Sequence, residues 1–175
     1  RQSMTRFNAQ NRVDATLISN LRIMRRTLIN QISKRCDKSK EIITGVVHAL
    51  LSRSIFIKYL EERKDSNGET VFPQDFYCNF MESAKWYTDV LNSKEATYNL
   101  FLTLKDKFNG DTLQVSEIET EIITQDDLDE LRTFILGNSE LESRQLTLWP
   151  LYSFDIIPIQ LISSIYELFF HLSDE

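Results

Sequence analysis

The sequence is poor in cysteine, glycine and proline, with two, four and three of them among 175 residues. Cys36 and Cys78 stand alone, so they provide neither a disulfide framework nor the paired spacing of a zinc knuckle. We read both as reduced thiols of a cytoplasmic protein. With so few turn-forming residues, the composition argues against an all-β fold.

Long apolar runs are also lacking. No stretch approaches the roughly 18 uncharged residues of a membrane span, and no signal-peptide pattern opens the chain. We therefore expect a cytoplasmic protein without a membrane partner. Because the first residue is Arg1 rather than Met, we also expect the chain to be a piece of a longer protein.

Charge is unevenly distributed. The net charge is −6, but residues 1–40 contain ten Lys or Arg against Asp14 and Asp37, a local balance of +8. The remainder contains ten basic and 24 acidic residues, a balance of −14. This asymmetry indicates a basic segment that faces a polyanion or an acidic partner surface, without distinguishing the two.

The spacing of apolar residues along the sequence is mostly that of helices. Apolar residues recur at spacings of three and four over residues 14–36, with Asp14 placed to cap the start. A second helix is predicted over residues 39–63, and it is apolar on most sides, which is typical of the buried centre of a bundle. Shorter helices are predicted near Phe76 and Tyr87, and further ones after Ser93, Ser116 and Thr124.

We therefore expect an all-α fold, a multi-helix bundle formed by residues 14–172. Residues 1–13 are predicted to be a polar N-terminal extension. Residues 144–154 alternate enough to predict a short extended ribbon, and a last helix is expected from Pro158 to about Leu172.

Three stretches carry a resemblance to a known family. They are the segment Leu148–Pro158 with the following Leu161–Glu167, the helix Ala49–Arg63, and the stretch Ser93–Asp111. They resemble the helical spacer of bacterial adenine-specific DNA methyltransferases, a family that includes fused restriction–modification enzymes. The resemblance implies a longer protein that continues after residue 175 into an S-adenosylmethionine-dependent methyltransferase domain, acts on double-stranded DNA and in fused forms carries an endonuclease.

The chemistry of methyl transfer has no matching positions in this sequence. The four glycines are isolated and no two prolines are adjacent, so the family's glycine-rich cofactor turn and its Asn-Pro-Pro-Tyr-like loop are both missing. The acidic group Asp126, Asp127, Asp129 and Glu130 falls in the first turn of a predicted helix, where it stabilises the dipole. His48 lies among apolar residues and is read as structural. We expect no catalytic residue, cofactor or metal in this chain.

Two sets of residues are candidates for binding. Arg22, Arg25, Arg26, Lys34 and Arg35 are predicted to contact the DNA backbone, because arginines and lysines bind phosphates through charge. The alternative is a solvated face that pairs with the acidic remainder of the chain. Arg53, Trp149, Tyr152 and Phe154 are predicted to dock the methyltransferase domain, and the alternative is an ion pair within the chain for Arg53 and ordinary core for the aromatic residues.

The functional hypothesis is therefore a non-catalytic helical domain that scaffolds a DNA adenine methyltransferase. The alternative is a stand-alone helical module that binds another protein through its basic helix or its C-terminal aromatic residues. A small nucleic-acid-binding regulator fits less well, because the chain is acidic overall and shows no helix-turn-helix spacing.

Overall fold

The regular elements in the described part of the chain are all helices. The computed structural model describes residues 2–108, 113–137 and 167, with side chains from Ala15 onward. The elements are α1 (Gln2–Ser33), α2 (Lys40–Glu62), the 3-10 helix η1 (Phe76–Asn79), α3 (Tyr87–Val90), α4 (Lys94–Phe108), α5 (Glu117–Ile122) and α6 (Gln125–Ile135). No strand occurs in these ranges, where Lys64 and Thr70 form one isolated bridge. The predicted all-α class is confirmed.

Helix α2 forms the axis of the bundle. Ser39 caps its start, with the hydroxyl accepting from the Ile42 N–H, and the Arg63 N–H closes its end on the Tyr59 carbonyl. Buried residues occupy most of its circumference, as predicted. By length and composition alone, α2 could cross a membrane, but 67% of its apolar window is buried inside the protein, as in a core helix.

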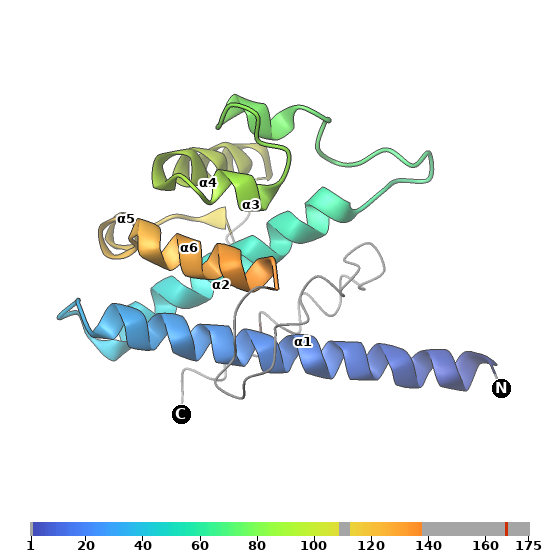
Figure 1. Ribbon diagram of the computed structural model, residues 1–175, viewed down its shortest axis with the longest axis horizontal. Helices are drawn as coiled ribbons and strands as arrows, with labels where there is room; N and C mark the ends of the chain where they lie inside the picture. Colours follow the sequence, from blue (N-terminus) through green and yellow to red (C-terminus); the bar gives the residue numbers. More distant parts are fainter. Residues whose placement is uncertain (1, 109–112, 138–166, 168–175) are drawn as a thin grey trace.

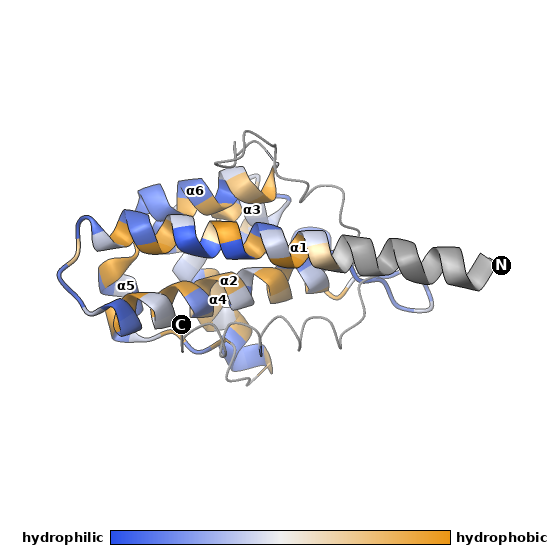
Figure 2. Ribbon diagram, turned by 90° about the horizontal axis from the view of Figure 1, so that it is seen from below, coloured by the Kyte–Doolittle hydropathy of each residue, from blue (hydrophilic) through white to orange (hydrophobic). Residues whose placement is uncertain are grey.

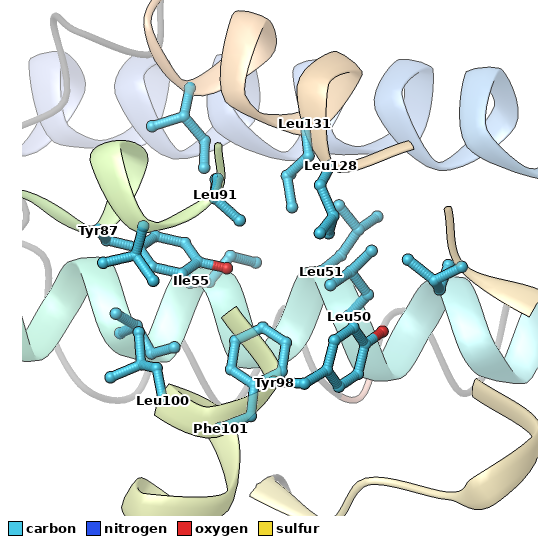
Figure 3. Close-up of a cluster of buried hydrophobic side chains, with 14 of the residues drawn as sticks. Leu50, Leu51, Ile55, Tyr87, Leu91, Tyr98, Leu100, Phe101, Leu128 and Leu131 are labelled. Carbon is cyan, nitrogen blue, oxygen red and sulfur yellow. The ribbon is translucent and has the colours of Figure 1, made fainter. Parts of the chain in front are cut away.

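The other helices pack around α2 in layers. In Figure 1, α1 lies along the bottom, α2 crosses behind α6, and α3 and α4 lie above them. Helix α1 packs against α2 and α6, while α2 also contacts α3 and α5. Figure 3 shows the centre of the core, where Leu50 and Ile55 of α2 face Phe101 of α4 and Leu128 of α6.

The start of α1 differs from the prediction. The helix begins at Gln2, so Asp14 lies inside it rather than at its N-cap, and residues 2–13 are helical. No glycine or proline interrupts residues 2–13, so nothing in the sequence prevents the helix from beginning before Asp14. Asp14 is therefore a residue type that favours an N-cap, but it does not mark the start of α1.

Most of the later helices begin or end at the capping residues that the sequence predicts. Ser93 accepts from the Ala96 N–H before α4, Ser116 from the Glu119 N–H before α5, and Gly137 (φ 77°) ends α6 as predicted. Near Phe76 the chain forms a 3-10 turn instead of an α-helix, beginning where the Phe76 N–H donates to the Pro73 carbonyl. The predicted ribbon at 144–154 and the helix from Pro158 lie outside the described residues.

Candidate functional site

Four of the five predicted DNA contacts, Arg22, Arg26, Lys34 and Arg35, are exposed. Arg22 and Arg26 lie one turn apart on α1, and Lys34 follows the end of this helix. Figure 2 views the bundle from the α1 side and shows hydrophilic bands along the described part of this helix. Arg22, Arg26 and Lys34 retain the accessibility that a phosphate contact requires.

Arg25 points into the bundle instead. Its Nε donates to Nε2 of His48 on α2 at 2.6 Å, and both side chains are half-buried. Burial, and then the nearby charge of Arg25, lower the pKa of His48 from 6.5 to about 4. A neutral His48 thus accepts from Arg25, and His48 has the structural role that its apolar neighbours predicted.

Arg35 is paired with an acidic residue of the same chain. Its guanidinium pairs with the fully buried Asp127 of α6 and donates to the Ile122 carbonyl at 3.1 Å. Lys38 lies 3.6 Å from Glu121 in the same region. Arg35 and Lys38 thus pair with acidic residues of the same chain, and Arg35 is a structural clamp between the end of α1 and α6.

Arg53 is buried within the chain. Its side chain has no exposed surface, and Nη1 and Nη2 donate to the two carboxylate oxygens of Glu119 at 2.7 and 3.1 Å. Nη2 also donates to the Gln114 carbonyl at 2.6 Å, and the guanidinium lies 4.4 Å from the centre of the Phe101 ring. Docking to another domain through Arg53 is therefore wrong, and the alternative of an intramolecular pair holds.

The ion pair belongs to a wider set of buried polar contacts. The Tyr98 hydroxyl donates to Glu119 at 3.1 Å, and the Tyr87 hydroxyl shares a hydrogen bond of 2.7 Å with Ser54. Burial, and then the negative charge of Glu119, raise the pKa of Tyr98 above its usual range, which keeps this hydroxyl protonated. At the end of α2, the buried Glu61 accepts from the Tyr87 N–H and from Lys58.

This set of contacts holds helices together and offers no reactive group to solvent. Within residues 15–108 and 113–137, no group of three or more His, Cys, Asp or Glu side chains could hold a metal ion. The cluster at Asp126–Glu130 has a structural role as predicted, because Asp127 accepts from the Thr124 N–H and hydroxyl and from Gln31. Cys36 and Cys78 are free thiols.

Several important residues were not singled out by the sequence. Glu119 lies three residues after Ser116, the spacing of a capping box, but its carboxylate is taken by Arg53 and Tyr98. Trp86 is 57% exposed at the start of α3. The remaining docking candidates, Trp149, Tyr152 and Phe154, lie outside the described residues.

Comparison with protein-family models, with curated proteins and with solved structures finds no match to this chain.

Proposed function

We propose that this chain is a non-catalytic helical domain of a bacterial DNA adenine methyltransferase or restriction–modification enzyme. In this proposal it is cytoplasmic and holds an S-adenosylmethionine-dependent catalytic domain of the same protein on double-stranded DNA. The stretches that resemble the family's spacer support it, because two of them coincide with much of α2 and with α4, helices that contribute many buried residues to the bundle.

The observation that carries the proposal is the character of the buried polar groups. Arg53, Glu119, Glu61 and Asp127 are all buried charged residues, and each has a partner on another segment of the chain. Charges used in this way fix the relative positions of helices and are unavailable for chemistry. The described residues thus have the properties of a scaffold.

The proposal is tested on the complete natural protein. Transfer of a labelled methyl group from S-adenosylmethionine to duplex DNA is measured with and without residues 1–175, and cofactor binding is measured in parallel. We expect the complete protein to methylate DNA, and the shortened protein to bind the cofactor but to lose methyl transfer. A folded complete protein that binds no S-adenosylmethionine and transfers no methyl group would contradict the proposal.

The second candidate function is a helical module that binds another protein. One observation favours it, since Trp86 exposes 57% of its surface beside Lys85, and tryptophan is enriched among residues that dominate protein interfaces. If the complete protein transfers no methyl group in that experiment, the next step is a search for a protein partner. Trp86→Ala is then the variant with which binding of that partner is compared.

A further inference from the structure

The exposed side of α1 differs in composition from the rest of the described surface. Its accessible positions between Ser19 and Lys34 are Ser19, Arg22, Arg26, Asn30, Ser33 and Lys34, which we call the α1 strip. Resting on the proposed function, we infer that the α1 strip binds the phosphate backbone of duplex nucleic acid without reading its sequence. Of the neighbouring basic residues, Arg25 contacts His48 inside the bundle, Arg35 pairs with Asp127 and Lys38 lies 3.6 Å from Glu121.

Helical geometry makes the strip continuous. Ser19, Arg22, Arg26, Asn30 and Ser33 follow one another at spacings of three and four, which brings them onto one face. At 1.5 Å per residue, Ser19 to Ser33 extends over about 21 Å. A duplex presents roughly one negative charge per 1.7 Å of its axis, so a helix of this length can meet several phosphates.

Charge complementarity identifies a polyanion as the partner. No Asp or Glu occurs between Ala15 and Cys36, and Asp14 is the only acidic residue in α1. The rest of the chain is strongly acidic, since residues 41–175 hold a balance of −14. An acidic body with one basic side would be oriented by the field of a duplex, with the α1 strip toward the phosphates.

The side chains of the strip favour duplex phosphates over the other polyanionic partners. Arginine, lysine, serine and asparagine are the donors that contact phosphate oxygens. The large hydrophobic residues exposed in the described structure, such as Trp86 and Leu102, all lie on other elements. The strip therefore has no aromatic ring for stacking single-stranded bases and no apolar anchor of the kind that dominates protein interfaces.

The structure also explains why the α1 strip contains only some of the basic residues that were predicted to contact DNA. Arg25 donates to His48, and Arg35 is paired with Asp127. Both guanidiniums are held by side chains of α2 or α6, and the phosphate contacts are assigned to Arg22, Arg26 and Lys34 on the ground of their exposure. Alanine at Arg25 or Arg35 would confuse binding with folding, whereas exposed positions can be changed with little effect on stability.

The test measures binding of the 175-residue chain to a fluorescent duplex of about 25 base pairs and mixed sequence, over a range of salt concentrations. The variant is Arg22→Gln/Arg26→Gln/Lys34→Gln, because glutamine keeps helix propensity while removing three charges. The matched control, Lys64→Gln/Lys85→Gln/Lys107→Gln, removes three exposed charges from other elements. Circular dichroism checks that both variants remain folded.

We expect the strip variant to bind roughly tenfold more weakly or worse, and its log–log salt slope to be shallower by about 2 to 3. The control should keep the slope of the parent chain. Three results would each overturn the inference. They are no duplex binding by the parent chain, equal losses of affinity in the two variants, or binding of a single-stranded probe as tight as binding of the duplex. None of these results involves methyl transfer, so they leave the test of the proposed function standing.

Discussion

At the scale of single residues, Arg53 has the most consequential position in the molecule. Its charge lies in the core, where solvation is lost and the carboxylate of Glu119, the Gln114 carbonyl and the Phe101 ring compensate it. We expect Arg53→Met to lower the free energy of unfolding by about 3 to 5 kcal/mol, because it leaves the Glu119 carboxylate buried without its partner. Urea denaturation measures this change, and Arg22→Met is the exposed control.

A second substitution separates the ion pair from simple packing. Glu119→Gln keeps an oxygen that can accept from the Tyr98 hydroxyl while removing the charge. We expect Arg53→Met/Glu119→Gln to be more stable than Arg53→Met alone, because the uncompensated charge has gone. If the double variant instead loses the sum of the two single losses, the pair is not coupled in this way.

His48 gives the protein a dependence on pH at the residue scale. Its folded pKa of about 4 lies below the unfolded value of 6.5 because of burial and the charge of Arg25. Between these values the unfolded chain binds a proton that the folded chain excludes, so the free energy of unfolding decreases as pH falls from 6.5 towards 4. Above this window the contribution of His48 is complete.

The variant His48→Gln isolates this effect. Glutamine does not titrate, but its side-chain oxygen can still accept from the Arg25 Nε–H. We expect urea denaturation at pH 7, 5.5 and 4.5 to show a steeper loss of stability for the parent chain than for His48→Gln. Parallel losses would assign the acid sensitivity to carboxylates elsewhere in the chain.

At the scale of elements, α6 is fastened to α1 through one carboxylate. Asp127 is fully buried and accepts from Arg35, Gln31 and Thr124. We expect Asp127→Ala to lower the free energy of unfolding by roughly 1 to 3 kcal/mol, because several donors lose their acceptor while Arg35 remains partly solvated. The exposed neighbour Asp126→Ala should change it by less than about 0.5 kcal/mol.

Hydrogen exchange distinguishes a clamp from a general stabiliser. With Asp127→Ala, the amides of α6 should exchange faster than those of α4, since α6 loses its tie to α1. Uniform acceleration across both helices would instead show that Asp127 acts on the stability of the whole molecule.

Local signals predicted the elements well, but they did not predict what the elements contact. Ser39, Ser93 and Ser116 marked helix starts because an N-cap acts within three residues. The partners Arg53 and Glu119 are 66 residues apart, and Arg35 and Asp127 are 92 apart. No spacing rule joins such pairs, although a charged residue in an apolar helix did indicate that Arg53 required a partner.

The same reasoning explains the outcome for the candidate site. A basic stretch can be read from sequence, and the alternation of exposed and buried positions in α1 follows from its period. Which arginines find a partner such as His48 or Asp127 depends on where α2 and α6 pack, and this is decided by the tertiary fold. Arg25 and Arg35 were therefore grouped with Arg22 and Arg26, although only the latter pair lies on the α1 strip.

At the scale of the whole molecule, the core is one cluster. Buried apolar residues from Leu17 in α1 to Ile135 in α6 belong to it, and α2 contributes to contacts on several sides. We expect the described helices to unfold cooperatively in urea, because removing any one of them exposes the surface of α2. Far-UV circular dichroism and the exchange of core amides in α2 and α4 should give the same midpoint, and Arg53→Met should move both midpoints together. Separate midpoints for α2 and α4 would show that the helices form two folding units despite their shared core.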